Sequence, residues 1–383
     1  TEKGPAIETP HGIYAIRYAG MGEVKQIEQW LAMNKATNFE EWLAALAQHT
    51  FASFNFVYSD KDGNIAFIHN SMTPVRIPGY NWHNYLPGDK SSLIWDRYIS
   101  FEKLPMVINP SSGYLISANQ SPFFVTSDKD NPDRKNYSNE DGFPTRMTNR
   151  AVRGLELLSE LDKIDEQTFS AIKHDKKYSK NSRAYKYLEK AMLADLGDLN
   201  TQKHEIYANA QTILKKWDLS TDKNNRGAAL GACIIGAEWL AEQQGENPPD
   251  PSGELKRCTD LLLDKIGRVD PKWGEVNRHI RGEINVALGG GPDTLRAIYG
   301  LGLEEKGYLT NVAGDGLYYL VSWDKDKKQK VLGIHQFGSA TLDENSPHYA
   351  DQAFDFANEI LHDPLFDANK RQQKLDRRYR PGQ

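Results

Sequence analysis

Cysteine is scarce in this chain, with two residues among 383, Cys233 and Cys258. So few cysteines exclude a disulfide-rich scaffold and a zinc site built from four cysteines. The pair can form one bridge or remain as buried thiols. The sequence therefore leaves the redox compartment open.

The chain also lacks a long apolar run and an excess of positive charge. No stretch approaches the roughly 18–20 apolar residues that a membrane helix needs. Lys and Arg total 47 against 52 Asp and Glu, which gives a net charge of −5. A general binder of nucleic-acid phosphates carries a basic face. We therefore expect neither a membrane span nor a nucleic-acid partner. At about 150 residues per domain, the length predicts two or three folding units or one large α+β body.

Strand patterns occupy much of the first third. Apolar and polar residues alternate at 11–18, which favours a half-buried strand. Residues 54–58 and 65–69 are strand-like and flank an Asp-Gly turn, so they predict a hairpin. A further short strand is expected at 115–119.

Two helices are predicted between these strands. Asn38 is a candidate N-cap and Glu41 stands three residues later, which is the pattern of a capping box. The helix before it is expected to turn one apolar stripe inward, because apolar residues recur there at three- and four-residue spacing. The predicted stripe comprises Val24, Ile27, Trp30, Leu31 and Asn34.

The middle of the chain is predicted to be helical and the last third to return to strands. Residues 247–251, rich in proline, are expected to break the helical region. Strands are expected at 316–323 and 330–334, and a final helix at 349–361. This order favours an α+β fold in which strands distant in sequence share sheets. The helices of the middle region are predicted at 148–161, 166–173, 184–194, 203–217 and 227–244.

Two local motifs have ordinary structural interpretations. Residues 289–292, Gly-Gly-Gly-Pro, precede a predicted helix start near Asp293, but their spacing is that of neither common phosphate-binding loop. A tight turn is therefore favoured. Ser339, His348 and Asp351 could form a catalytic triad. A loop and helix cap anchored by Ser346 is the favoured use of that segment.

Two further features concern metal binding and nucleophilic catalysis. Asp128, Asp130 and Asp133 lie in a polar loop whose oxygens would suit calcium, although the full EF-hand pattern is absent. A solvated acidic loop is favoured. Thr1 could act as an N-terminal nucleophile with its own amine as base, but an arbitrary chain start is the preferred interpretation.

Five stretches, in matching order, resemble the penicillin acylase family, which also includes acyl-homoserine-lactone and lipopeptide acylases. The most specific resemblance runs from Leu104-Pro105 through Asn-Pro-Ser-Ser-Gly-Tyr-Leu-Ile-Ser-Ala-Asn-Gln, which ends at Gln120. The helical middle matches most weakly. The five stretches cover residues 2–18, 29–42, 54–65, 104–120 and 346–352.

The resemblance implies an N-terminal-nucleophile amidohydrolase with an αββα sandwich and an inserted helical segment, here incomplete at its N-terminus. In that family a precursor cuts itself and exposes a serine, which attacks the amide carbonyl of an N-acyl compound. The serine would lie upstream of this fragment of the large subunit. The partners implied are the small subunit, the rest of the large subunit and a small-molecule N-acyl substrate. The fragment alone would then be inactive.

Family roles transfer to four residues. Asn119 occupies the position of the oxyanion-hole asparagine, and Arg150 that of the arginine near it and near the nucleophile's amine, although Arg146 and Arg153 stand close enough to blur that assignment. Trp30 and Phe54 fall at aromatic positions of the acyl pocket. Both would also serve as plain core residues.

The same resemblance implies further properties of the whole protein. The chemistry requires no cofactor, and one structural calcium is possible because Asp130 lies near a calcium carboxylate of the family. Residues 1–145 would form the β-rich core, 146–280 the helical segment and 281–383 the returning strands and final helix. A periplasmic or secreted location is implied. The alternative function is an acyl-ligand-binding homologue that has lost the nucleophile.

Overall fold

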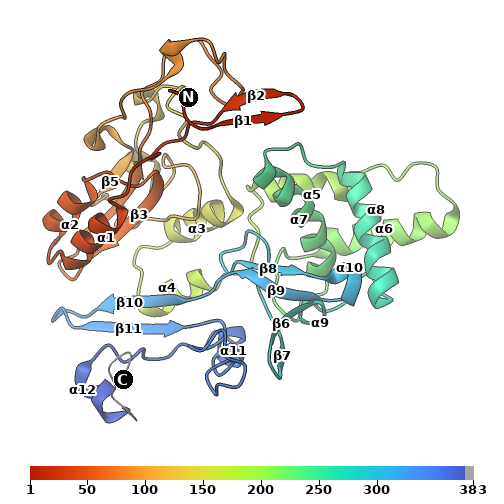
Figure 1. Ribbon diagram of the computed structural model, residues 1–383. Helices are drawn as coiled ribbons and strands as arrows, with labels where there is room; N and C mark the ends of the chain where they lie inside the picture. The colour runs from red at the N-terminus through yellow and green to blue at the C-terminus, as the bar shows by residue number, and fades with distance from the viewer. Residues whose placement is uncertain (376–383) are drawn as a thin grey trace. The chain divides into compact units, whose positions relative to one another are not determined.

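The computed structural model describes residues 1–375, and the chain divides into two compact units, Thr1–Ala151 and the part from Val152 onward. Figure 1 labels their helices and strands. No helix within the described part is long and apolar enough to span a bilayer. The expected division at residues 145 and 280 stays a prediction, and its last part includes 376–383, which lie outside the described residues.

The first unit is built around a small antiparallel sheet. Strands β3 (Ser53–Ser59) and β4 (Ile65–Ser71) form the predicted hairpin, and β5 (Met106–Ile108) pairs with the other edge of β4. The turn is closed by Asp60, whose carboxylate accepts hydrogen bonds from the backbone N–H groups of Asp62 and Asn64. Gly63, at φ +90°, supplies the left-handed residue that this turn needs.

Two helices pack on one face of that sheet: α1 (Gln26–Lys35) and α2 (Phe39–Leu46). Helix α2 begins as predicted, because Asn38 Oδ1 accepts from the N–H of Glu41 at 2.9 Å. The Glu41 carboxylate accepts from Thr37 instead of from Asn38, one residue earlier than in a standard capping box. The core here joins Met33 and Leu46 of the helices to sheet and loop residues.

The predicted inward stripe of α1 is wrong. Val24 and Ile27 are 81% and 80% exposed, whereas Gln29 and Met33 are buried. Gln29 turns inward because its side-chain amide makes two hydrogen bonds there. It donates to the carbonyl of Leu46 and accepts from the N–H of Thr50, so it pairs backbone groups at and after the end of α2. A buried amide with these partners outweighs the apolar spacing.

Two strand predictions in this unit also need correction. Residues 11–18 do not form one strand; a hairpin of β1 (Ala6–Thr9) and β2 (Gly12–Ala15) lies there instead. Residues 115–119 form no strand, although Ile116 N–H donates to the carbonyl of Val125. This segment lacks a ladder partner and is a side-chain-supported loop.

The second unit contains the predicted helices with small shifts at their ends. They are α3 (Asn149–Ser159, whose first turn belongs to the first unit), α4 (Glu166–Lys173), α5 (Arg183–Leu193), α6 (Thr201–Lys216) and α7 (Ala228–Gln244). The sequence analysis missed α8 (Pro251–Ile266). Asp250 caps α8 and Pro251 is its first residue, so the proline-rich breaker is also a helix start. Cys233 of α7 and Cys258 of α8 form a disulfide.

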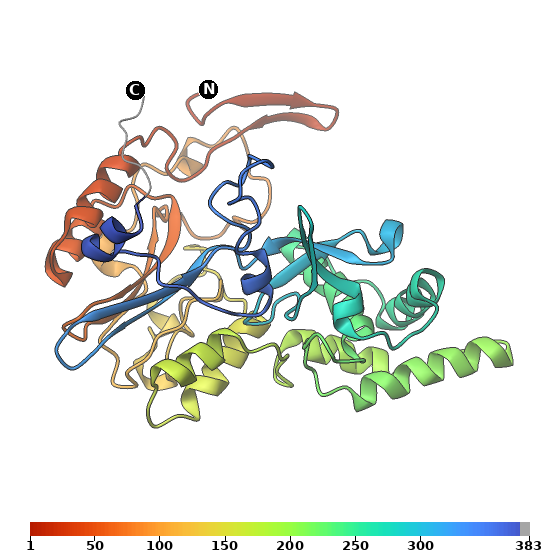
Figure 2. The ribbon, with the colours of Figure 1, turned by 90° about the horizontal axis from the view of Figure 1, so that it is seen from below.

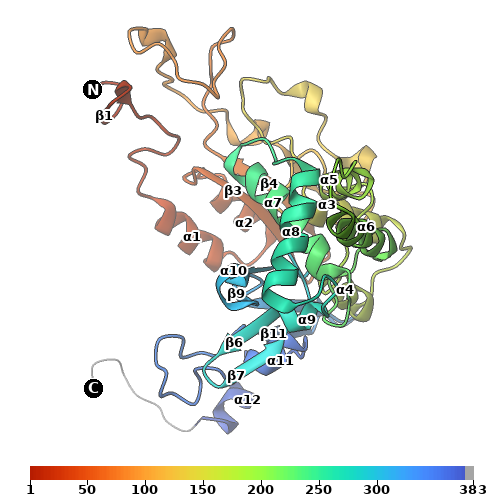
Figure 3. The same ribbon diagram turned by 90° about the vertical axis from the view of Figure 1, so that its right-hand side faces the viewer.

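A four-stranded sheet that the sequence analysis did not predict follows the helices. Its order is β7-β6-β9-β8, with β6 (Asn277–Arg281), β7 (Ile284–Ala287), β8 (Ile298–Leu301) and β9 (Leu309–Gly314). Short helices α9 (Trp273–Val276) and α10 (Leu303–Lys306) connect to it. Figure 3 views α7 and α8 beside this region.

The predicted strands near the C-terminus are present. Strands β10 (Tyr318–Trp323) and β11 (Gln329–Ile334) form a two-stranded ribbon, clearly seen in Figure 2. The expected helix at 349–361 is shorter, namely α11 (Ala353–Ala357), because Glu359 adopts a left-handed φ of +61° that ends it. A last helix, α12, spans Ala368–Gln373.

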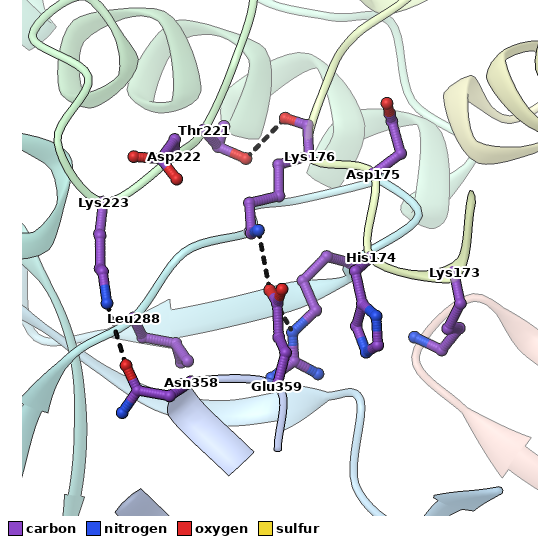
Figure 4. A network of polar contacts seen from close by, with 12 residues as sticks. Lys173, His174, Asp175, Lys176, Thr221, Asp222, Lys223, Leu288, Asn358 and Glu359 are labelled. Atoms are coloured by element: carbon purple, nitrogen blue, oxygen red, sulfur yellow. Dashed lines mark hydrogen bonds and ion pairs between the residues drawn. The ribbon is translucent and has the colours of Figure 1, made fainter. Parts of the chain in front are cut away.

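A buried charge network ties distant parts of this unit together, and Figure 4 shows its part around Lys176 and Glu359. The fully buried Arg296 pairs with Asp315 at 2.8 Å and donates to the carbonyl of Phe356. Glu359 accepts from Lys176 at 2.8 Å, and its carboxylate lies 3.8 Å from Arg296 Nε. Buried charges are tolerated when they are paired in this way, so the network fixes the segment after α11 against the loop after α4.

Candidate active site

Asn119 is presented by a strained, exposed loop. Its φ is +61°, in the left-handed region that asparagine tolerates better than most residues. Such conformations persist only where the surroundings enforce them, and they concentrate at functional sites. The contacts around Asn119 show how this loop is enforced.

Gln120 holds the loop around Asn119 through its side-chain amide. Its side chain is buried, and its Oε1 accepts from Ala118 N–H at 2.6 Å. Its Nε2 donates to the carbonyls of Ile116 (2.9 Å) and Phe124 (3.0 Å). One amide thus satisfies three backbone groups on both sides of Asn119. Sequence analysis missed this residue, because nothing in the local pattern separates it from a surface glutamine.

Thr148 connects the same loop to the start of α3. Its hydroxyl accepts from Ala151 N–H at 3.1 Å, as a helix cap does, and donates to the carbonyl of Ala118 at 3.0 Å. The N–H of Ser121 also donates to the carbonyl of Arg146 at 2.9 Å. The first turn of α3 is therefore held at a fixed position beside Asn119.

Arg150, in that first turn, reaches Asn119. Its Nη2 donates to Asn119 Oδ1 at 3.0 Å. A guanidinium can only donate, so the amide must turn its oxygen toward Arg150 and its NH₂ group away from it. Arg153 instead pairs with Asp175 at 3.0 Å. The predicted pairing of Arg150 with Asn119 is thus present, whereas Arg153 is engaged by Asp175.

The two aromatic candidates meet in a separate cluster. Trp30 is 41% exposed and its ring lies 5.2 Å from Phe51 and 5.6 Å from Phe56. Phe54 is 55% exposed and contacts the same two rings, at 6.1 and 5.8 Å. The structure therefore brings Trp30 and Phe54 to one partly exposed aromatic cluster. Their role in an acyl pocket stays a prediction.

The carboxylate of Asp130 is held by serine and backbone donors. It accepts from the hydroxyls of Ser111 (2.9 Å) and Ser127 (3.1 Å) and from the N–H of Ser112 (3.1 Å). Desolvation raises the pKa of this carboxyl, but these hydrogen bonds outweigh that effect and lower its pKa overall. Within residues 1–375, no three His, Cys, Asp or Glu side chains gather closely enough to hold a metal. Asp130 could supply one ligand, and the calcium site stays a prediction.

The remaining sequence candidates take part in local structure. His348 pairs with Asp351 at 2.8 Å, and the hydroxyl of Ser346 accepts from the N–H of His348 at 3.2 Å. Thr1 donates from its hydroxyl to the carbonyl of Gly4 at 2.7 Å. At residues 289–292 the chain turns at Gly290, φ +97°, but no helix begins near Asp293, contrary to the prediction.

This chain resembles known proteins in sequence and in fold. The family model described as penicillin amidase matches residues 1–373. Penicillin G acylase of Escherichia coli is 34% identical over 116 residues, which are 30% of this chain and 14% of that protein. The crystal structure of a thermostable penicillin G acylase from Alcaligenes faecalis superposes with a TM-score of 0.58 at 16% identity, over 98% of this chain and 78% of that one. That likeness confirms the predicted α+β, N-terminal-nucleophile hydrolase fold, and the family match establishes that this chain belongs to the penicillin amidase family.

Proposed function

We propose that this chain carries the oxyanion-binding amide of an enzyme that hydrolyses the amide bond of an N-acyl compound. The observation that supports this most directly is the hydrogen bond from Arg150 to Asn119, on a loop clamped by Gln120 and Thr148. Family membership supports amide hydrolysis of acyl compounds in general. The residues and the mechanism assigned below are part of the proposal.

The reaction needs a donor where negative charge develops. A serine at the N-terminus of the processed large subunit, upstream of this chain, attacks the acyl carbonyl while its own α-amine accepts the proton. The carbonyl oxygen becomes an oxyanion, and the NH₂ group of Asn119 donates to it. A single preorganised donor of this kind lowers the barrier by about 3–4 kcal/mol. The protonated α-amine then returns its proton to the leaving nitrogen as the C–N bond breaks, and water, activated by the same amine, hydrolyses the acyl-enzyme and frees the acid and the serine.

Arg150 acts on this step through Asn119 and through its charge. Holding Oδ1 prevents the amide from rotating and presenting its oxygen to the oxyanion, which would be repulsive. A fixed positive charge close to the α-amine would also lower the pKa of that amine and keep it unprotonated at neutral pH. Both effects require Arg150 to stay at its position in the first turn of α3.

The substrate class follows from the family and from the aromatic cluster. Trp30 and Phe54 would form part of an apolar wall that grips the acyl group by burying its surface, at about 25 cal/mol per Å². Candidate substrates are acyl-homoserine lactones, lipopeptides and penicillin-like compounds. No cofactor takes part in the chemistry, and calcium at Asp130 would be structural. The partners are the small subunit and the rest of the large subunit.

A location outside the cytoplasm is part of the same proposal. The Cys233–Cys258 disulfide supports it, because such bridges persist mainly in oxidising compartments. The periplasm or the exterior of the cell is therefore proposed, together with maturation of a precursor by self-cleavage.

The test uses the intact, processed protein and a series of chromogenic N-acyl anilides. Hydrolysis is expected, together with a covalent adduct of phenylmethylsulfonyl fluoride on the N-terminal serine of the large subunit, located by mass spectrometry. Saturable substrate binding without turnover or adduct would instead establish the non-catalytic binder. An adduct on Thr1 would show that the nucleophile lies in this chain and would refute the assignment.

A further inference from the structure

The second unit contains a cavity that the proposed reaction does not use. It measures about 700 Å³, within the 300–1,000 Å³ range of ordinary small-molecule sites. Helices α7 and α8 form one side, and β8, α10 and β9 form the other (labelled in Figure 1). The lining is mainly apolar, with Trp273, Val276, Ile298 and Leu309 among its side chains.

Small residues on α7 leave one side of the cavity unfilled. Ala229, Ala232 and Gly236 of α7 face the cavity at helical spacing. A Cβ built on Gly236 would meet no atom within 4 Å, so the space beside it is truly vacant. Small-molecule sites are concave and mostly apolar, and a vacant apolar wall of this kind can accept an apolar ligand.

The hydroxyl of Thr310 offers the cavity a hydrogen-bonding group. Within the described residues, the hydroxyl oxygen of Thr310, a cavity-lining residue on β9, is buried and makes no hydrogen bond. Leaving a buried hydroxyl unpaired is costly, and a ligand atom that hydrogen bonds to it would remove that cost. The cavity therefore favours a ligand with one hydrogen-bond donor or acceptor.

The charges at the cavity are balanced. Arg257 donates to Glu254 through Nε at 2.9 Å and lies 3.7 Å from Glu304. The other charged lining residues, Glu305 and Lys306, have opposite signs and are neighbours in α10. The four charged lining residues sum to zero, and Arg257 is also held by Glu254 outside the lining, so no positive charge is left to compensate an anionic ligand, whose desolvation would be expensive.

We propose that this cavity is a binding site for an uncharged, mainly apolar small molecule that carries one hydrogen-bonding group, which pairs with the hydroxyl of Thr310. The site is distinct from Asn119 and Arg150, which belong to the other unit. Its existence does not depend on the proposed hydrolysis, and no catalytic readout enters its test.

The experiment titrates the intact protein with the neutral dye N-phenyl-1-naphthylamine and follows its fluorescence. Toluene, benzyl alcohol and benzoate then compete with the dye. Saturable binding of one dye per chain is expected, with benzyl alcohol displacing it at no more than one-tenth of the benzoate concentration. Absence of saturable binding, or equal displacement by benzoate, would overturn the proposal.

Two variants locate the ligand. Gly236→Phe fills the vacant space and should weaken dye binding at least tenfold without lowering the melting temperature, since glycine is a poor helix former; Gly236→Leu is the fallback if the larger ring prevents folding. The matched control is Gly88→Phe, in the first unit, where a Cβ also meets nothing and binding should be unchanged. Thr310→Val should weaken benzyl alcohol relative to toluene by about two- to tenfold, the value of one net hydrogen bond. Unchanged dye binding in the Gly236 variant, or an unchanged ratio in the Thr310 variant, would refute the assignment.

Discussion

Asn119 combines a special backbone conformation with a proposed chemical role, and three substitutions separate the two. Alanine at φ +61° would be strained by about 1–2 kcal/mol, whereas glycine adopts this conformation without strain. Aspartate keeps the shape and can still accept from Arg150 at the position of Oδ1, but it has no N–H to donate. The three variants thus differ in stability and share the loss of one donor.

All three variants are expected to lose activity to a similar degree. Removing an oxyanion donor costs about 3–4 kcal/mol, or about 10²–10³ in kcat. KM should change little, because the oxyanion exists only in the transition state. Urea unfolding should rank Asn119→Ala as the least stable of the three variants, with Asn119→Asp close to the original protein.

The assay measures kcat and KM for an N-acyl anilide on the intact processed enzyme, with the urea midpoint of each variant. If Asn119→Asp keeps a kcat within tenfold of the original, the donor role is wrong. If Asn119→Gly alone retains activity, the backbone conformation matters and the side chain does not.

Three further changes test the supports of the fold and the site. Gln120→Leu leaves three backbone groups near Asn119 unpaired. At roughly 1 kcal/mol per group, we expect the free energy of unfolding in urea to fall by about 2–4 kcal/mol, and kcat to fall as well. A decrease below about 1 kcal/mol would contradict the supporting role of Gln120. Burial lowers the pKa of His69 to about 4 from an ordinary value near 6.5, so the folded state resists its protonation and stability falls as pH drops from about 6.5 to 4, by up to about 3 kcal/mol. His69→Gln should flatten calorimetric melting temperatures over that range, and an unchanged slope would show that other groups cause it. The disulfide joins residues 25 apart in the sequence. By chain entropy, replacing Cys233 and Cys258 with alanine should lower the free energy of unfolding, measured in urea, by about 3.5 kcal/mol. No change would mean that the bridge does not stabilise the fold.

Local patterns predicted those elements whose cause is local. The start of α2 follows from Asn38, and the β3–β4 hairpin follows from the Asp-Gly turn, because a cap or a turn is decided by a few neighbouring residues. The inward stripe of α1 failed because the partner of Gln29 is the backbone near Leu46 and Thr50, which no helical period can reveal.

For the candidate site, the sequence determined the residue types and the family to which their order belongs: an asparagine that tolerates a left-handed backbone and an arginine in the first turn of a helix. It also supplied the two cysteines of the second unit. Only the tertiary structure decided that Arg150 and not Arg153 reaches Asn119, that Gln120 holds the loop, and that the cysteines pair. The Arg150–Asn119 contact and the disulfide join residues at least 25 apart in the sequence, whereas the contacts of Gln120 are local but exist only in the folded loop. Both kinds of contact are set by packing, which no local spacing encodes.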